Sequence, residues 1–226
     1  MERCSNTAAV SGKELIGGIA GANSYGNIRY CRNTGTVGND KAEQVGGIVG
    51  AHQNYAELIA SYNTGEVKGA DYIGGIAGNV YVASMPLGCY NVGSVSSGMH
   101  CGGAVGSFGG DDYITIKKGS FYQGPLSAAY QANGAKMRSA EDMKKESFVS
   151  ELNADAYVTC YTKDTQNKNN GYPILTWEVD GFQVTFNANG GDCDITDVNV
   201  AVNGSLNELP TPYRWNYKFD GWFTEK

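Results

Sequence analysis

The side chains of this chain that could hold a metal are few and scattered. It has only two histidines, His52 and His100, and no HExxH zinc-peptidase motif. We expect His52, which follows a glycine in GAHQNY, to be a loop residue. His100, Cys101 and Cys89 would supply three ligands, but a closed zinc site needs four and the spacing offers no fourth. We therefore expect no metal and no cofactor.

A second group of reactive side chains follows the last glycine doublet, namely Asp111, Asp112, Tyr113, Lys117 and Lys118. Polysaccharide-cleaving β-helices need acid and base side chains on one face. Adjacent residues on a strand point to opposite faces, so Asp111 and Asp112 cannot share one. We expect a solvated loop there and no catalytic residues, with a carbohydrate-active β-helix enzyme as an alternative.

Tyrosines are the more informative side chains, because the chain has 15 of them and several recur near expected strand edges. Exposed aromatic rings stack on sugars or anchor a protein partner. The alternative is that these rings pack against the outer wall of the fold. The candidates for facing a ligand are Tyr55, Tyr62, Tyr72, Tyr81 and Tyr90.

Two short sequence motifs recur along the chain with the same period. The repeats that they define must position these side chains. Glycine doublets begin at Gly17, Gly46, Gly74 and Gly102, with spacings of 29, 28 and 28 residues. Between them runs a phrase of the type CRNTGTV, whose asparagines are Asn6, Asn33, Asn63 and Asn91, spaced by 27, 30 and 28. A period of this length predicts stacked repeats, each too small to bury its apolar side alone.

Residues 1–125 are therefore predicted to form an all-β, right-handed parallel β-solenoid of about 28-residue repeats. Equivalent residues should lie in columns at the strand spacing. The predicted columns are Val10, Val37, Val67 and Val95; Ile16, Val45, Ile73 and Cys101; Ile19, Ile48, Ile76 and Ala104; and Cys4, Cys31, Ser61 and Cys89. In the last column a thiol acts as a small hydrophobe, so we expect free cysteines.

Glycine is expected to serve two purposes in each repeat. Val45 and Ile48 are three residues apart, so a bend at Gly46–Gly47 is needed to turn both inward. In the Asn-Thr-Gly phrases, Gly35 and Gly65 are expected to supply a positive φ.

A change of composition marks the end of the solenoid, because 25 of the 32 glycines fall in residues 1–125. A fifth repeat begins at 119–126 but has no doublet, so the stack is expected to end there. Residues 126–180 are predicted to cap it with a helix over 139–153, begun by Ser139 and Asp142, and a strand over 171–177. Residues 181–226 begin another small β module.

The phrases SYNTGEVKGADYIGGIAG and CRNTGTVGNDKAEQVGGIVG resemble the GLUG-type repeat of secreted bacterial adhesins and of non-catalytic regions of some IgA-specific metallopeptidases. The segment VTFNANGG…LPTPYRWNYKFDGWFTEK is similar to the Listeria–Bacteroides repeat, also called the internalin B-type B repeat, a β-grasp-like module. That family's unit continues past its GW element to a further strand, so we expect a partial module here.

These resemblances imply a non-catalytic cell-surface or secreted protein, a rigid spacer or adhesion module that binds a host, matrix or glycan ligand. The alternatives are the stalk of a larger surface peptidase and the β-helix enzyme above. A net charge of −6 disfavours nucleic acid, and no apolar run suits membrane insertion. We expect a monomeric solenoid within a longer chain, with its signal and anchor outside this sequence.

Overall fold

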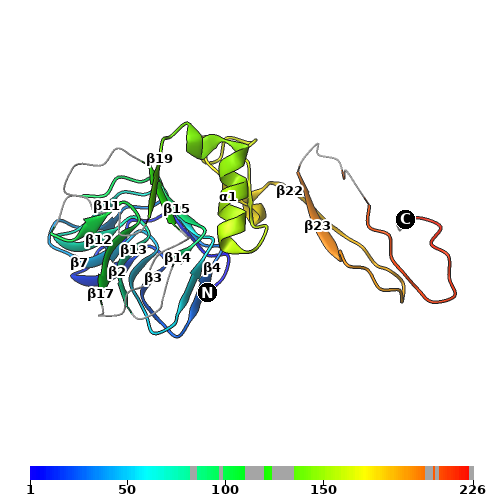
Figure 1. Cartoon of the computed structure of the whole chain (residues 1–226), viewed down its shortest axis with the longest axis horizontal. Coiled ribbons are helices and arrows are strands. Elements are labelled where there is room, and N and C mark those ends of the chain that lie inside the picture. Colours follow the sequence, from blue (N-terminus) through cyan, green and yellow to red (C-terminus); the bar gives the residue numbers. More distant parts are fainter. Residues whose placement is uncertain are drawn as a thin grey trace. The chain divides into compact units, whose positions relative to one another are not determined.

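The computed structural model describes residues 1–81, 86–96, 99–109, 120–123, 135–201, 206 and 209–223. The chain divides into two compact units, Met1–Leu175 and Thr176–Lys226. The first is a stack of short parallel strands with one helix, α1, packed against it, and the second holds an antiparallel pair of strands (Figure 1).

In the described part of the first unit, the second and third repeats each contribute five short strands, and strands at the same place in successive repeats pair in parallel. The largest sheet contains β1 (Ser5–Asn6), β5 (Arg32–Asn33), β10 (Tyr62–Asn63), β15 (Cys89–Asn91), β18 (Ser120–Gln123) and β19 (Lys136–Arg138). Two sheets flank the glycine doublets: β2 (Glu14–Gly17), β7 (Glu43–Gly46), β12 (Asp71–Gly74) and β16 (Cys101–Gly102); and β3 (Ala20–Ser24), β8 (Val49–Gln53), β13 (Ala77–Tyr81) and β17 (Val105–Gly109). The smaller sheets contain β4 (Asn27–Arg29), β9 (Glu57–Ile59) and β14 (Pro86–Leu87); and β6 (Val37–Gly38) and β11 (Val67–Lys68).

The strand register confirms the predicted columns. Ile73 pairs with Val45 on one side and with Cys101 on the other, and Val67 pairs with Val37 and Val95. The six interior residues Val37, Val45, Ile48, Val67, Ile73 and Ile76 are all 0% exposed. Each such side chain contributes roughly 1.5–3 kcal/mol by leaving water. The chain therefore forms the predicted parallel β-solenoid with turns of about 28 residues.

The glycine doublets form the predicted bend. Strand β7 ends at Gly46 and β8 begins at Val49, and the bend between them turns both Val45 and Ile48 into the core. A Cβ at Gly46 would lie 2.0 Å from the carbonyl oxygen of Val49. No side chain fits at this position, which explains why glycine recurs there.

The predicted positive φ at Gly35 and Gly65 is wrong, because neither residue is among those with a left-handed backbone. A Cβ at Gly65 would instead lie 2.0 Å from the carbonyl oxygen of Gly35. Glycine is required here because the backbones of successive repeats lie directly on one another.

The stack extends further than the sequence predicted. Strand β18 pairs with β15, as the start of a fifth repeat should, but β19 then pairs with β18 and adds one more parallel strand. Strand β19 could not be predicted, because Lys136–Arg138 has no glycine doublet and does not resemble the earlier phrases.

The predicted helix over 139–153 is divided. A 3-10 turn η1 (Asp142–Lys144) precedes α1 (Glu146–Ala156), and extended backbone at Lys145 separates them. The predicted Ser139–Asp142 pair exists, because the Asp142 N–H donates to Ser139 Oγ at 3.0 Å, but it begins the 3-10 turn. The apolar side is buried as expected and comprises Met143, Phe148, Val149 and Leu152.

Helix α1 packs on a corner of the solenoid at Gly88. This residue has φ of 58°, and a Cβ there would lie 2.7 Å from Cβ of Ala156. The strand predicted over 171–177 is shorter in the structure: β21 covers only Ile174–Leu175, and a 3-10 turn η2 (Thr176–Glu178) follows it. Strand β21 pairs antiparallel with β20 (Tyr161–Thr162). The described helices include none long and apolar enough to cross a membrane.

All six cysteines are free, as predicted. Burial raises the pKa of the Cys31 thiol to about 11 and that of Cys89 to about 12. These thiols therefore stay protonated at neutral pH and act as small apolar side chains.

The second unit contains β22 (Gly181–Thr185) and β23 (Asp197–Ala201), paired antiparallel. Phe186 is buried, and its ring centroid lies 4.9 Å from that of Trp222. Trp222 Nε1 donates to the carbonyl oxygen of Pro210 at 2.8 Å, which ties the last described segment to this small core.

Candidate ligand-binding surfaces

Tyr55 is the only one of the five predicted ligand-facing tyrosines that is largely exposed, at 70%. It follows β8 in the left-handed conformation, with φ of 58°. Tyr25 lies in the corresponding loop of the preceding repeat, with φ of 56° and 76% exposure. The two loops are in register, because Ser24 pairs with Gln53, and Asn54 Nδ2 donates to Ser24 Oγ at 3.0 Å. The solenoid therefore presents two exposed tyrosines, Tyr25 and Tyr55, from neighbouring turns, which we call the tyrosine pair.

Tyr72 is half-buried because His100 of the next turn covers one ring face. The ring centroids lie 4.7 Å apart with planes 7° apart. Asp71 fixes this histidine, since its Oδ1 accepts the His100 backbone N–H at 3.0 Å and lies 2.7 Å from Nδ1. Tyr72 therefore offers less free surface than Tyr55.

Tyr81 is also partly covered. Its hydroxyl accepts a hydrogen bond from Asn79 Nδ2 at 2.6 Å, at the end of β13. The Tyr81 ring therefore lies along its own strand, with its hydroxyl group beside Asn79.

Tyr62 and Tyr90 do not face a ligand, which corrects the prediction for both. Each is 0% exposed, and their rings stack with centroids 5.0 Å apart. Tyr90 also contacts Phe148 of α1 and Tyr161 of β20. Its hydroxyl donates to the carbonyl oxygen of Pro173 and accepts from Asn169 Nδ2. Tyr90 therefore attaches the cap to the solenoid, and Tyr62 supports it from the preceding turn.

A signal for this burial lies in the column that contains them. Register aligns Ser5, Arg32, Tyr62, Tyr90 and Phe121 across five turns of the largest sheet. The column changes from polar to aromatic where α1 covers it. The aromatic residues at this outward position in successive repeats are therefore the sequence signal for the contact.

His52 is a strand residue of β8 and is 0% exposed, so the predicted loop position is wrong. Its Nδ1 lies 3.3 Å from Asn23 Nδ2 of the preceding turn. Nε2 has no hydrogen-bond partner within the described part of the chain. Burial lowers the pKa of His52 to about 4, so the imidazole is neutral at physiological pH.

His100 and the two nearby cysteines are separated by the fold. Cys101 packs inside with Val45 and Ile73, Cys89 belongs to a different interior cluster, and His100 stacks on Tyr72 outside. Among the described residues no cluster of three or more metal-ligating side chains occurs. The predicted loop group of Asp111, Asp112, Tyr113, Lys117 and Lys118 lies outside the described residues.

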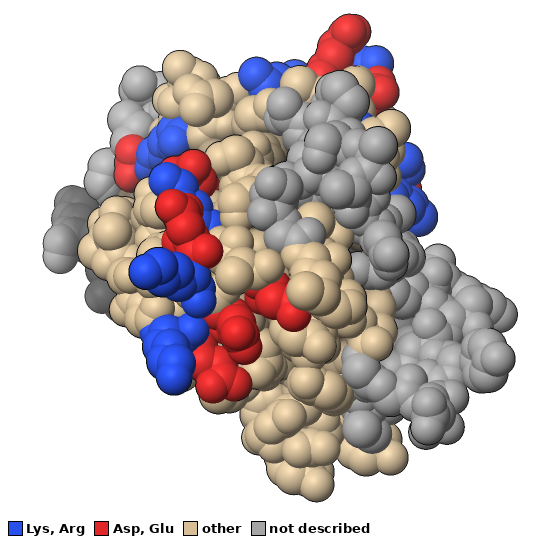
Figure 2. All heavy atoms as spheres, turned by 90° about the vertical axis from the view of Figure 1, so that its left-hand side faces the viewer, with Lys and Arg blue, Asp and Glu red and all other residues tan. Residues whose placement is uncertain are grey.

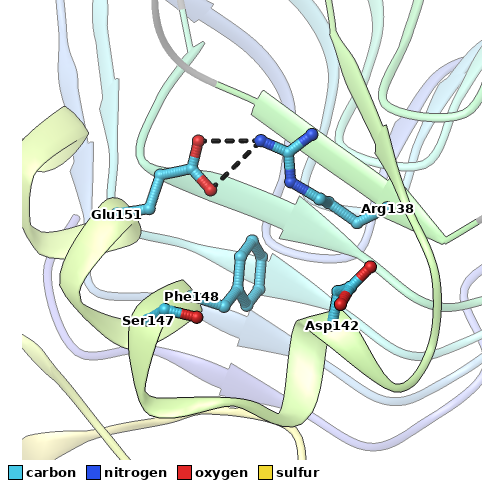
Figure 3. Close-up of a pocket in the computed structure, with 5 residues that line it drawn as sticks. All are labelled: Arg138, Asp142, Ser147, Phe148 and Glu151. Atoms are coloured by element: carbon cyan, nitrogen blue, oxygen red, sulfur yellow. Dashed lines mark hydrogen bonds and ion pairs between the residues drawn. The ribbon is translucent and has the colours of Figure 1, made fainter.

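A hollow of about 300 Å³ lies between β19 and α1, and Arg138, Asp142, Ser147, Phe148 and Glu151 line it (Figure 3). Arg138 Nη2 donates to both carboxylate oxygens of Glu151, at 2.9 and 3.2 Å. Both charges are therefore already paired, and this pairing joins α1 to the last parallel strand.

Charged side chains of both signs are interspersed along the face of the solenoid in Figure 2. On the solenoid surface the ammonium of Lys68 lies 3.1 Å from the carboxylate of Glu66. Glu14, Glu43 and Asp71 occupy one column of the β2–β7–β12 sheet. A surface of mixed sign does not create the large field that steers a polyanion.

The fold and these surfaces define a β-solenoid repeat protein. Residues 12–38 match the GLUG motif, and residues 182–226 match the Listeria–Bacteroides repeat domain. The GLUG match spans β2 to β6, which is one turn of the solenoid. Both are repeat domains typical of bacterial surface proteins. No curated protein and no solved structure matches the chain.

Proposed function

We propose that this chain is a non-catalytic module of a bacterial cell-surface or secreted protein. The solenoid acts as a rigid spacer, and the tyrosine pair contacts a host, matrix or glycan ligand. The location is supported by the two repeat domains, which are typical of bacterial surface proteins.

The observation that carries the spacer role is the continuous interior of the solenoid. Apolar columns fill it, and a ladder of asparagine side chains runs through it from turn to turn. In this ladder Asn33 Nδ2 donates to Asn63 Oδ1 at 2.7 Å, and Asn63 Nδ2 donates to Asn91 Oδ1 at 2.8 Å. A stack in which every turn is packed and hydrogen-bonded to the next behaves as one stiff body.

The adhesive role is supported by the exposure of the tyrosine pair. Tyrosine combines a large apolar ring with a polar hydroxyl and is enriched at binding hot spots. Two rings on adjacent turns, 76% and 70% exposed, offer a contact that the fold itself does not use. The rigid stack beneath them limits the entropy lost on binding.

A binding screen with the whole chain tests this function. The immobilised chain is exposed to a panel of matrix proteins and glycans, and each ligand that binds is then recovered and its mass measured. We expect saturable binding of at least one ligand and no change in its mass. Cleavage of a bound polysaccharide would show an enzyme instead, and a complete absence of binding would contradict the adhesive role.

A further inference from the structure

The second unit contains a cavity of about 150 Å³ beside the Asn-Gly-Gly turn. Two backbone hydrogen bonds between Asp192 and Tyr213, both 2.8 Å, join the turn to the segment that forms the opposite wall. Asn189 and Gly190 adopt left-handed backbone conformations, with φ of 47° and 85°. The cavity is thus formed by local hydrogen bonds within this unit.

Arg214 lies in the wall of this cavity and is held from two sides. Its Nη1 donates to the carbonyl oxygen of Asn189 at 3.0 Å. Its guanidinium carbon lies 4.2 Å from the ring centroid of Tyr217. A guanidinium has five N–H donors, so this single bond leaves others for a ligand while the stacking holds the group in place.

The aromatic side chains around Arg214 are exposed, although the unit buries other aromatic rings. Tyr213 is 63% exposed, Trp215 75% and Tyr217 67%. Phe186 and Trp222, by contrast, pack against each other within the unit. The ring of Tyr217 has Arg214 over it and is otherwise largely accessible to solvent.

The charge of the cavity differs from that of the unit around it. Residues 176–226 contain eight acidic and three basic residues. Two of those three bases, Arg214 and Lys218, line the cavity, and none of its lining residues is acidic. Positive charge is therefore concentrated at one concave site, which favours a ligand that carries a local negative charge.

We propose that this cavity binds a carboxylated sugar residue of a glycan. The carboxylate pairs with Arg214 and Lys218, and the apolar face of the sugar ring lies against the exposed tyrosines. A free phosphate would use the two cations but not the aromatic rings, and a neutral sugar would leave the cations unpaired. The cavity volume suits a single ring better than a drug-sized ligand, whose pockets are about 300–1,000 Å³. This inference rests on the proposed function, because a cell-surface or secreted module is exposed to extracellular glycans.

The test compares two probes on the whole chain by isothermal titration calorimetry. One is a glucuronate-containing tetrasaccharide, and the other is the same tetrasaccharide with its carboxyl groups reduced to alcohols. We expect the acidic probe to bind about tenfold more tightly or better, since charge-assisted hydrogen bonds depend on the carboxylate. Equal affinities for the two probes, or no binding of either, would overturn the proposal.

Variants locate the site. Arg214→Gln and Lys218→Gln should each weaken binding of the acidic probe about tenfold or more. Lys218→Gln does not involve the Arg214–Asn189 hydrogen bond, so it keeps the test valid if Arg214→Gln disturbs the turn. Tryptophan fluorescence reports whether the unit stays folded in each variant, because all three tryptophans, Trp177, Trp215 and Trp222, lie in residues 176–226.

A matched control separates this site from the solenoid surface. Tyr157→Ala changes a 71% exposed tyrosine of the first unit that is not part of the tyrosine pair, and it should leave binding of the acidic probe unchanged. If Tyr25→Ala abolishes that binding and the two glutamine variants do not, the sugar site is on the solenoid: this inference then fails while the proposed function stands. Failure of the chain to bind any member of the wider panel would instead reject the proposed function.

Discussion

The side-chain amide of Asn63 lies directly against the backbone of Gly47. A Cβ at Gly47 would come within 2.4 Å of Asn63 Cγ. The same relationship joins Gly18 to Asn33, and Gly75 to Asn91. The two phrases that keep a common period in the sequence therefore meet inside each turn, where the second glycine of the doublet makes room for the asparagine ladder.

Replacement of Asn63 by alanine should break the ladder at its centre. Asn63 Nδ2 donates to Gly65 O and to Asn91 Oδ1, both at 2.8 Å, and these buried acceptors would each lose a donor. We expect the free energy of unfolding to fall by about 1–3 kcal/mol, measured by urea denaturation. Asn6→Ala is the matched control at the partly exposed first position of the ladder and should cost less. A larger loss for Asn6→Ala would contradict the ladder's role.

An aspartate at Ile48 tests the interior columns. Ile48 is 0% exposed between filled turns, so Ile48→Asp would bury an unpaired charge or force its protonation. Asn39→Asp, in a turn, is the control and should cost far less. Thermal unfolding followed by circular dichroism compares the two variants, and similar melting temperatures would refute the assignment of Ile48 to the core.

His52 should make the solenoid sensitive to acid. Its folded-state pKa is about 4 because of burial, while the unfolded chain has the ordinary value of 6.5. Between these values the unfolded state binds the proton and the folded state does not. The contribution to stability is therefore complete above pH 6.5 and falls as the pH drops toward 4, by about 3 kcal/mol in total.

The matched variant is His52→Val, because Val80 occupies the equivalent position one turn further on. Unfolding free energies of the two proteins, measured at intervals from pH 7 to 4, give a difference curve that isolates the imidazole from other titrating groups. We expect the wild type to lose stability relative to the variant over this range. Parallel curves would mean that His52 is not neutral and buried.

The second unit should be the less stable of the two. Strands β22 and β23 form an isolated antiparallel pair among the described residues, and such a pair is marginal by itself. Backbone amides near Val184 and Phe186 should therefore exchange with deuterium much faster than those near Ile48 and Ile76. Hydrogen exchange followed by mass spectrometry measures both, and equal protection would contradict this ranking.

The solenoid could be predicted because its apolar positions recur with a fixed period along the sequence. The columns of Val37 and Val67, and of Val45 and Ile73, each recur with the same neighbours, so one period fixes the register of the whole stack. The contact between cap and solenoid occurs once. Tyr90 packs against Phe148 and Tyr161, Tyr62 stacks on Tyr90, and no repeat encodes the position of the cap residues.

The candidate surfaces were predicted less well for the same physical reason. Tyr55 and Tyr62 are both tyrosines near strand edges, yet one is 70% exposed and the other is covered by a later segment. The position of His52 does not keep one residue type from turn to turn, because Asn23 occupies it one turn earlier and Val80 one turn later. Arg214 could not be predicted as a site residue because its partner Asn189 lies 25 residues earlier in the chain and no sequence motif links the two.

In the proposed function, a rigid solenoid presents the tyrosine pair to a ligand. The most direct measurement is the dissociation constant of the whole chain, and of its Tyr25→Ala/Tyr55→Ala variant, for a ligand found in the binding screen. We predict that the double variant binds roughly tenfold more weakly or worse, as expected for the loss of aromatic anchors. Tyr157→Ala, which changes a 71% exposed tyrosine after α1, should bind like the wild type. Unchanged affinity of the double variant would contradict the claim.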